Sequence, residues 1–328
     1  MEPGLMIPIS IEEFIDGISI PADLYIRIGE SKFILIQKKG QKTDRSQLGN
    51  YRNKEVQYFW VEKSCYGKIS KQNITLAGIA VKKENVDLKK KTAILGAAAK
   101  SVFTELEQMG ASPEIFNYAM QVTQATMSLV ESHNELQLLL ENFSRNADTL
   151  LAHSLAVSMV SVMIGKAMGW EKRVTIEKLS LGGLLHDIGL KTIPPELLER
   201  PLAQMNYDEI QLYQTHPFRG MQLLQSLGVV PDDIVSIVYE HQENRIGQGY
   251  PQRIRDSKIH PLARVVGLAD QFCYLVIPNV NHPIPKNTRE AIMFMEYTMG
   301  QPYNREAFKA LKTVVQGKTF NYTHNKAG

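Results

Sequence analysis

The stretch "GLLHDIGLKTIPPEL" at residues 183–197 places His186 and Asp187 side by side, directly after an apolar run. Neighbouring residues lie about 100° apart around a helix, so these two side chains can grip adjacent metal ions. Imidazole and carboxylate ligands together suit Fe, Mn, Zn or Ni better than Mg or Ca. Such a pair is a weak signal alone, and its meaning depends on whether further ligands accompany it.

Further candidate ligands occur in the same half of the chain. The sequence has eight histidines, and four of them stand at or beside the ends of helical segments in this half. A single histidine on an apolar helix is usually a core residue, but burying several imidazoles and carboxylates together is costly unless metal ions pair with them. No cysteine belongs to the set, which disfavours a structural zinc site. The candidates are His153, His186, Asp187, His216, His241 and Asp270.

The overall composition is that of an ordinary soluble protein. The chain has 328 residues, of which 44% are hydrophobic and 22% are charged, so it has room for two or three domains and a sizeable core. Its net charge of +3 is too small to favour binding to a nucleic acid polymer or to a membrane surface. The lysine-rich segments 38–42 and 82–91 are therefore interpreted as solvated loops.

The sequence favours a cytoplasmic location. The two cysteines, Cys65 and Cys273, have no nearby partner in the sequence, so a disulfide framework is not expected. Residues 1–14 lack the basic start and apolar core of a signal peptide. The most apolar stretch, residues 149–165, is slightly short for a membrane span and contains His153, so a buried helix explains it better.

The hydrophobic patterns predict an α+β protein, in which a small β-rich N-terminal module precedes an all-α domain. The segments "DLYIRI" (23–28) and "KFILIQKKG" (32–40) are typical of a hairpin, and "VQYFWVEK" (56–63) is typical of a further strand. From residue 92 the period is helical, and the run at 112–146 is long enough for a connecting helix or a dimer-forming hairpin. We expect a β-rich module at 1–85, linker helices at 86–146 and a helical domain at 147–328.

At the level of motifs, the chain resembles the HD superfamily of metal-dependent phosphohydrolases. The ordered ligands and the segments "HDIG" (186–189), "HPFRG" (216–220), "HQENRIGQGYP" (241–251) and "ARVVGLAD" (263–270) are similar to its HD-GYP branch. That branch is associated with hydrolysis of bacterial cyclic dinucleotides, chiefly cyclic di-GMP. The resemblance covers roughly residues 147–320. The segments "PADLYIRI" and "YFWVEKSCY" also look like a small module found ahead of some HD-GYP domains.

The resemblance implies a binuclear metal centre. It assigns one metal to His153, His186, Asp187 and Asp270, and a second metal to His216 and His241 with Asp187 as the bridge. Two ions about 3.5–4 Å apart lower the pKa of a bridging water and orient it for attack on phosphorus. Some members hold a third metal through a Glu where this chain has Thr149, so we expect two divalent ions. Iron or manganese is the first expectation, with zinc or nickel as alternatives.

The chain departs from the HD-GYP pattern at several positions. Leu190 stands where a lysine is expected, which leaves the adjacent Lys191 as the candidate catalytic cation beside Asp187. Gln242 replaces a second histidine, and Ile246 and Cys273 replace aspartates. The basic segment that the family carries soon after position 273 is not recognisable. The predicted metal ligands are thus nearly complete, whereas the groups that grip the substrate are fewer.

Four functions remain open at this point. The chain is a working cyclic di-GMP phosphodiesterase, a weakly active or inactive module that binds a cyclic dinucleotide or a partner protein, a different HD phosphohydrolase, or a non-enzymatic scaffold built on residues 112–146. The scaffold would bind no metal and would tolerate loss of His186. Gln242, Gly249, Tyr250 and Pro251 are candidate substrate-binding or loop residues, and the loop is also a candidate surface for a protein partner. Arg264 faces a phosphate or makes a structural ion pair.

Overall fold

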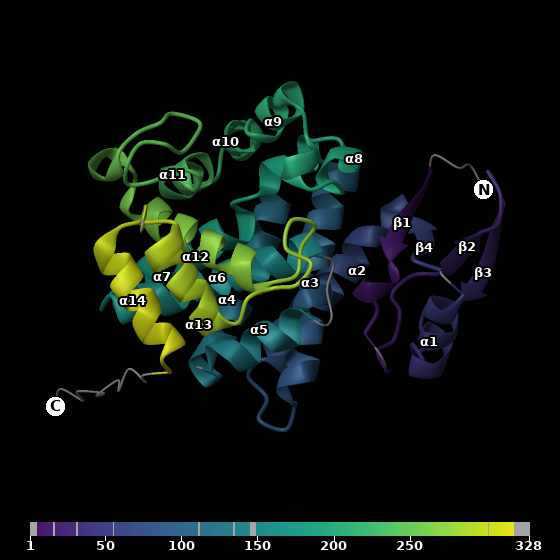
Figure 1. The fold of residues 1–328 in the computed structure, drawn as a ribbon. Coiled ribbons are helices and arrows are strands. Elements are labelled where there is room, and N and C mark those ends of the chain that lie inside the picture. The colour runs from purple at the N-terminus through teal and green to yellow at the C-terminus, as the bar shows by residue number, and fades with distance from the viewer. Residues whose placement is uncertain are drawn as a thin grey trace. The chain divides into compact units, whose positions relative to one another are not determined.

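The computed structural model describes residues 5–15, 17–30, 32–54, 56–110, 112–133, 135–144, 149–300 and 302–317. The chain divides into two compact units, residues 1–125 and 126–328. The first, called here the N-terminal unit, combines a sheet with helices, and the second, the helical unit, is built from helices (Figure 1). The sequence-based division at residues 85 and 146 cuts the chain elsewhere, and it stays a prediction about which parts fold independently.

The N-terminal unit contains a four-stranded antiparallel sheet with the strand order β1-β4-β2-β3 (Figure 1). Its strands are β1 (Met6–Ser10), β2 (Leu24–Arg27), β3 (Phe33–Gln37) and β4 (Tyr58–Glu62). The β2–β3 hairpin and strand β4 confirm the strands that the alternating runs predicted. The face of the sheet that carries Ile9, Leu24 and Phe59 forms the core of this unit.

The segment expected as a β-rich module, residues 1–85, also contains two helices that the sequence did not predict. Residues Arg45–Asn53 form helix α1, and residues Lys63–Ala80 form helix α2, which is followed by α3 (Leu88–Met109). The buried face of α2 includes Ser70 and Asn73. These polar side chains interrupt the apolar stripe that identifies an amphipathic helix. The end expected for this module, residue 85, lies in the turn between α2 and α3.

A buried carboxylate connects the short 3-10 helix η2 (Ile11–Glu13) to α2 and α3. Glu13 Oε2 accepts hydrogen bonds from Tyr66 Oη at 2.6 Å and from Ser101 Oγ at 2.9 Å, and Oε1 accepts one from Thr104 Oγ1 at 3.0 Å. Asn73 donates to the Glu13 main-chain oxygen at 2.9 Å. Burial raises the pKa of Glu13, and the three hydroxyl donors oppose this rise.

The helical run at 112–146, predicted as a connecting helix or a hairpin, contains two helices. Helix α4 spans Pro113–Ser132 and crosses from the first unit into the second, and α5 spans Leu136–Ser144. At the end of α4, Ser132 Oγ donates to the main-chain oxygens of Ser128 and Leu129 at 3.0 and 3.1 Å. Such local side-chain bonds compete with continuation of the helix.

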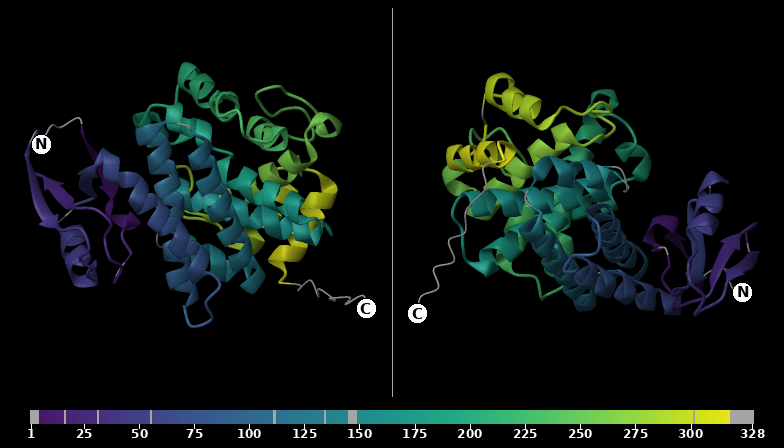
Figure 2. Two further views of the ribbon diagram at one scale, coloured as in Figure 1. Left: turned by 180° about the vertical axis from the view of Figure 1, so that it is seen from behind. Right: turned by 90° about the horizontal axis from the view of Figure 1, so that it is seen from below.

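The rest of the helical unit is a bundle of helices and short helical turns. Helix α6 packs against α7, α12 and α14, and the yellow-green C-terminal helices lie against the teal helices in both views of Figure 2. These elements are α6 (Thr149–Ala167), α7 (Arg173–Leu185), η3 (Ile188–Thr192), α8 (Pro195–Leu198), η4 (Leu202–Gln204), α9 (Tyr207–Tyr213), α10 (His216–Ser226), α11 (Asp232–Glu240), η5 (Asp256–Lys258), α12 (Pro261–Val276), α13 (Thr288–Met293), η6 (Phe294–Thr298) and α14 (Arg305–Val315).

Helix α6 is the apolar helix that the sequence singled out. Among the described residues it alone is long and apolar enough to cross a membrane, with a mean hydropathy of 1.5 over Leu150–Ala167. In the structure 78% of that window is buried, as in the core helix of a soluble protein. Its apolar side chains therefore face neighbouring helices, and His153 enters the interior of the unit from this helix.

Candidate metal centre

Five segments of the helical unit bring the six predicted ligands together. His186 and His241 directly follow the last residues of α7 and α11, and His216 is the first residue of α10. His153 comes from α6 and Asp270 from α12. Asp187 lies at the start of η3 with φ −96° and ψ 14°, in the bridge region where many active-site residues are found.

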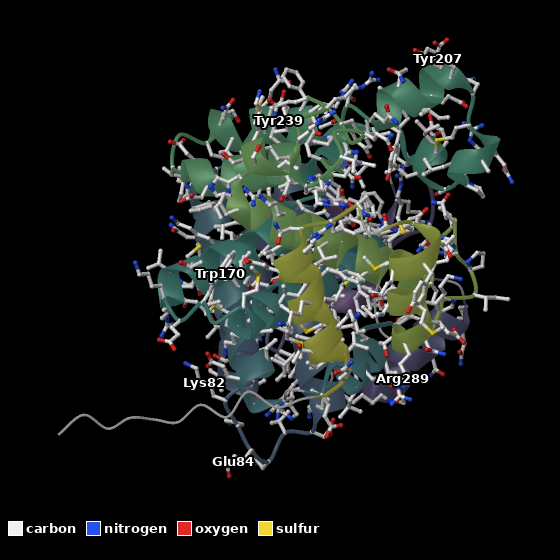
Figure 3. The ribbon with its side chains drawn as sticks, turned by 60° about the vertical axis from the view of Figure 1, so that its left-hand side comes forward. Lys82, Glu84, Trp170, Tyr207, Tyr239 and Arg289 are labelled. Carbon is white, nitrogen blue, oxygen red and sulfur yellow. The ribbon has the colours of Figure 1, made fainter. Side chains whose placement is uncertain are left out.

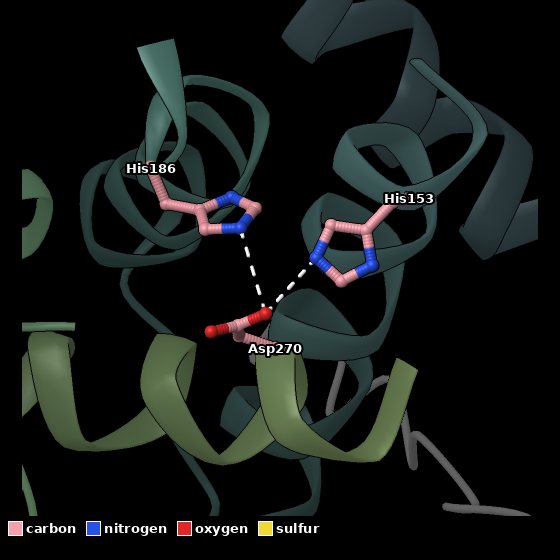
Figure 4. A group of neighbouring side chains, drawn as sticks. All are labelled: His153, His186 and Asp270. Atoms are coloured by element: carbon pink, nitrogen blue, oxygen red, sulfur yellow. Dashed lines mark hydrogen bonds and ion pairs between the residues drawn. The ribbon is translucent and has the colours of Figure 1, made fainter. Parts of the chain in front are cut away.

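One group of ligands surrounds Asp270. Asp270 Oδ1 lies 2.9 Å from His153 Nε2 and 3.7 Å from His186 Nε2 (Figure 4). Each of these three residues offers a ligand atom, and the three atoms lie within 4.8 Å of one another. Figure 4 shows both imidazole rings pointing toward the same carboxylate oxygen. One divalent ion fits this combination of donors.

A second group surrounds Asp187. Its Oδ1 lies 3.2 Å from His216 Nε2 and 3.4 Å from His241 Nε2, while Oδ2 lies 3.3 Å from His186 Nε2. The Nε2 atoms of His216 and His241 are 3.2 Å apart. His186 and Asp187 with His241 again offer ligand atoms within 4.8 Å. The two oxygens of Asp187 thus face different histidines, as a carboxylate that bridges two ions does.

The backbone sets the orientation of three imidazole rings. His186, His216 and His241 each place Nδ1 at 2.8 Å from the carbonyl oxygen three residues earlier, in Gly183, Tyr213 and Val238 respectively. A carbonyl oxygen only accepts, so each Nδ1 carries the proton. The Nε2 atom of each ring is therefore the one that faces the ligand cluster. Metal-bound histidines commonly donate their other ring N–H in this way.

Two buried atoms in the cluster lack a hydrogen-bond partner. They are His186 Nε2 and Asp187 Oδ1. A buried polar atom without a partner is unfavourable by roughly 1–3 kcal/mol, and more when it is charged. Here the neighbours of Asp187 are Nε2 atoms, which in neutral rings are acceptors facing an acceptor. A cation held between these atoms satisfies all of them at once, so the residues fit divalent metal ions.

The pKa shifts in the ligand cluster also indicate that the cluster favours a bound positive charge. Burial lowers the pKa of His186, but the carboxylates of Asp187 and Asp270 outweigh burial and hold it well above its usual range. Burial raises the pKa of Asp187, but His186 and the neighbouring imidazoles hold it well below its usual range. Burial, helped by the charges of two neighbouring histidines, lowers the pKa of His241. The carboxylates are thus held ionised, ready to bind a cation.

Two glycines allow the ligand-bearing segments to approach closely. A Cβ atom at Gly189 would lie 1.9 Å from the main-chain oxygen of His216, and one at Gly267 would lie 2.3 Å from that of His241. Real Cβ atoms never come this close to a backbone oxygen, so a side chain at either position would push the ligands apart. Gly189 is the glycine of the "HDIG" segment. This close contact explains why a residue without a side chain is needed at that position.

Gln242 supports a ligand in the structure. Its Nε2 donates to Asp270 Oδ2 at 2.9 Å, which leaves Oδ1 of Asp270 facing His153. The sequence predicted Gln242 as a weaker substitute for a ligating histidine, and it gave no signal of this pairing because the two residues are 28 positions apart. Sequence reasoning also missed Glu243, whose buried carboxylate accepts from the main-chain N–H groups of residues 252–254 and so shapes the loop.

The loop "HQENRIGQGYP" places its tyrosine beside the cluster. The ring of Tyr250 meets the ring of His216 edge-on, with centroids 6.0 Å apart. Gly249 is buried, and a Cβ there would lie 2.3 Å from the main-chain oxygen of Gln242, so the loop folds tightly back on its own start. Pro251 follows, half-buried. Tyr250 and Gly249 therefore belong to the wall of the site.

The remaining predicted residues lie in different settings. Leu190 is buried in an apolar cluster with Ile193, Leu197 and Met205. Lys191, on η3, is half-buried. Arg264 donates from Nε to the main-chain oxygen of Ile259 at 3.0 Å and lies 3.7 Å from Asp256, so the structure gives it a structural ion pair.

Comparison with known proteins identifies the family. A family model described as "HD domain" matches residues 113–306. The chain is 26% identical over 221 residues to a cyclic di-GMP phosphodiesterase of Pseudomonas aeruginosa, covering 67% of this chain and 51% of that protein. It is 27% identical over 242 residues to a cyclic di-GMP phosphodiesterase of Thermotoga maritima, covering 73% of this chain and 58% of that protein. A 3′3′-cGAMP-specific phosphodiesterase of Vibrio cholerae is 31% identical over 123 residues, which are 37% of this chain and 27% of that protein.

The fold also matches a solved structure. An HDG"Y"P protein from Bdellovibrio bacteriovorus superimposes with a TM-score of 0.74 at 20% identity, over 95% of this chain and 99% of that chain. By contrast, the chain spans only about half the length of the curated relatives that it matches. The family match covers more than half of this chain and includes the whole ligand cluster. The chain therefore belongs to the HD domain family, and its fold is that of the HDG"Y"P protein from Bdellovibrio bacteriovorus.

Proposed function

We propose that the protein binds a cyclic dinucleotide at the candidate metal centre and hydrolyses one of its phosphodiester bonds. The cluster of six ligand side chains, with its two unpartnered buried atoms, carries this proposal. The relatives supply the substrate class, because they are named as phosphodiesterases of cyclic di-GMP and 3′3′-cGAMP.

We assign the ligands to two divalent ions, iron or manganese by preference. His153, His186, Asp187 and Asp270 would hold one ion, and Asp187, His216 and His241 would hold the other. Ions bound there would neutralise charge on the phosphate and make a bound water acidic enough to attack it. The protein itself orients the donors through the carbonyl oxygens behind three histidines and through Gln242 behind Asp270. Lys191 is the proposed cation for the leaving oxygen.

A second candidate function is a module that binds the nucleotide with little turnover. Leu190 favours it, because this side chain packs among apolar neighbours and offers no donor where related proteins carry a lysine. Donors aimed at developing charge are typically worth about 10²–10³-fold in rate. In this second function the cyclic dinucleotide binds at the same metal centre but is hydrolysed slowly.

Leu190→Lys tests whether the missing donor at position 190 limits the rate. The new ammonium group would have to leave the apolar cluster to reach solvent, and burying it there costs several kcal/mol. We expect a lower melting temperature and no gain in turnover. A faster variant of unchanged stability would show instead that position 190 limits the rate.

The main experiment uses the full-length chain loaded with iron or manganese. Elemental analysis should find about two ions per chain, and chromatography should detect linear or mononucleotide products from cyclic di-GMP or 3′3′-cGAMP. His186→Ala should lose both metal and turnover, whereas the matched control His260→Ala should keep them, because His260 pairs with Asp233 outside the cluster. A protein that takes up no metal and is unaffected by His186→Ala would favour the scaffold built on residues 112–146.

A further inference from the structure

Tyrosine side chains line the candidate metal centre in addition to the six ligands. Tyr213, Tyr250 and Tyr274 are each half-buried. Within the part of the chain that the structure describes, none of their hydroxyl groups makes a hydrogen bond. None of the three hydroxyl oxygens is among the buried atoms without a partner, so each is accessible from outside the protein and can reach a bound molecule.

Tyr213 is fixed against a proposed ligand. It is the last residue of α9, and its ring packs on the ring of His216 with centroids 5.2 Å apart. Its main-chain oxygen accepts the Nδ1 proton of the same histidine. Burial, followed by the charges of Asp187 and Asp270, raises its pKa well above the usual range. Its ring position against His216 places its phenol beside the ligand cluster, where its hydroxyl can donate.

Tyr274 approaches the centre from another side. It follows Asp270 by one turn of α12, and residues four positions apart lie on the same face of a helix. Its ring meets the ring of His282 edge-on, with centroids 4.9 Å apart, which fixes its direction. Burial, followed by the charge of Asp270, raises its pKa to about 12. Its position one turn from Asp270 is the geometric reason for placing its hydroxyl at the centre.

Tyrosines elsewhere in the chain make a useful contrast. Tyr66 donates to Glu13 at 2.6 Å, and Tyr118 donates to Glu114 at 2.8 Å. Burial raises the pKa of both residues, as it does around the metal centre, but there each hydroxyl has a carboxylate acceptor. The hydroxyls of Tyr213 and Tyr274 lack an acceptor of this kind. They are therefore free to donate to a molecule bound at the centre.

We propose that Tyr213 and Tyr274 donate hydrogen bonds to the non-bridging phosphate oxygens of the bound phosphodiester. This inference rests on the proposed function and names the groups that bind its substrate. A phosphate carries the acceptor oxygens that the hydroxyls lack, and metal ions offset its repulsion from the carboxylates. The two phenols thus supply donors in a centre where Leu190 supplies none.

The test measures binding by calorimetry in the metal-loaded full chain, with inorganic phosphate and with cyclic di-GMP as separate probes. Tyr213→Phe and Tyr274→Phe keep the rings and remove only the hydroxyls. Hydrogen bonds to charged groups contribute about 1.5–3 kcal/mol, so each variant should bind both probes about 10- to 100-fold more weakly. Metal content should stay unchanged. Tyr207→Phe is the matched control, because Tyr207 is 74% exposed at the periphery of the unit (Figure 3).

The outcomes separate this inference from the proposed function. Unchanged binding of both probes by both Phe variants, with hydrolysis intact, would overturn the inference and leave the function standing. Weaker binding of cyclic di-GMP by Tyr→Ala but not by Tyr→Phe would also overturn it, because the rings would then stack on a base. A metal-loaded wild type that binds neither probe would overturn both. Loss of metal in the Phe variants would make the tyrosines structural and contradict the inference.

Discussion

Each of the two units buries a carboxylate, and their surroundings are opposite. Glu13 in the N-terminal unit is surrounded by hydroxyl donors, all of which are used. Asp187 in the helical unit faces three imidazole Nε2 atoms and keeps an oxygen without a hydrogen bond. Burial raises the pKa of Glu13, whereas histidines overcome burial and lower that of Asp187.

This difference distinguishes a structural carboxylate from a functional one. A buried acid whose neighbours are donors is complete within the protein, and it holds helices together. A buried acid whose neighbours are lone pairs is incomplete without a cation. Burial and hydrogen-bond counting alone would group the two residues together, so the direction in which the neighbouring atoms donate is the deciding observation.

The sharpest test of the comparison replaces each acid. Asp187→Ala should release both ions, because this side chain faces both ligand groups, and hydrolysis should fall at least about 10³-fold with them. Glu13→Gln should keep both metal and activity. Elemental analysis and product chromatography on the two variants give the answer. Equal metal content in Asp187→Ala and wild type would break the comparison.

Removal of metal should affect the two units unequally. Ions present at about 100 times their dissociation constant stabilise the native state by about 2.7 kcal/mol. For a unit of this size, that corresponds to roughly 5–10 °C in melting temperature. Chelation should therefore lower the melting temperature of the helical unit, with no change in the hydrogen exchange of the amides around Glu13. Uniform loss of protection in both regions would contradict the expectation.

A smaller effect is expected at Gln242. Removing the amide that donates to Asp270 should reduce metal affinity by about 10-fold, as for other groups that orient a ligand. Competition with a chelator measures this for Gln242→Ala. Gln242→Glu serves as the comparison, because it retains the shape but presents acceptors to Asp270, and it should be worse. Identical affinities for wild type and both variants would mean that Asp270 needs no support.

The smallest effect concerns the pH dependence of the N-terminal unit. The pKa of Glu13 is raised above its ordinary value of 4.5. Its stabilising contribution is therefore fully present below pH 4.5 and declines as the pH rises through the higher folded value. The Glu13→Gln variant has no carboxyl group to titrate at this position. Its free energy of unfolding relative to wild type should therefore improve as the pH rises from 4.5 through the raised pKa of Glu13. Parallel stability curves from denaturant titrations would show that Glu13 does not titrate there.

The sequence-based predictions were correct where the signal lies within a few neighbouring residues, and they failed where it depends on distant contacts. The hairpin and strand β4 were predictable, because alternation over a few residues reports one buried face. Helix α2 was not, since Ser70 and Asn73 lie on its buried face and disguise the period. Asn73 is there because it bonds to Glu13, which is 60 positions away, and no local pattern reports that contact.

The same distinction between local and long-range signals applies to the candidate site. The order and spacing of the histidines and aspartates indicated the family, and the structure brings those six residues together. The pairing of Gln242 with Asp270 and the placement of Tyr213 and Tyr274 depend on how separate helices meet. Tyr213 and Tyr274 lie outside the quoted motifs, and the motif that contains Gln242 does not report its partner, so only the three-dimensional arrangement reveals these contacts.

The carbonyl oxygens behind His186, His216 and His241 have a consequence for mutational tolerance. Each imidazole is oriented by main-chain atoms of residues 183, 213 and 238, and every amino acid carries the same carbonyl oxygen. Substitution at position 213 or 238 therefore leaves the ring anchor in place as long as the helical turn survives, whereas a Cβ at Gly183 would lie 2.7 Å from the main chain of Ser158. A library of apolar side chains at the buried position 238 should consequently retain metal-binding clones, and a glycine pair in that turn should eliminate them.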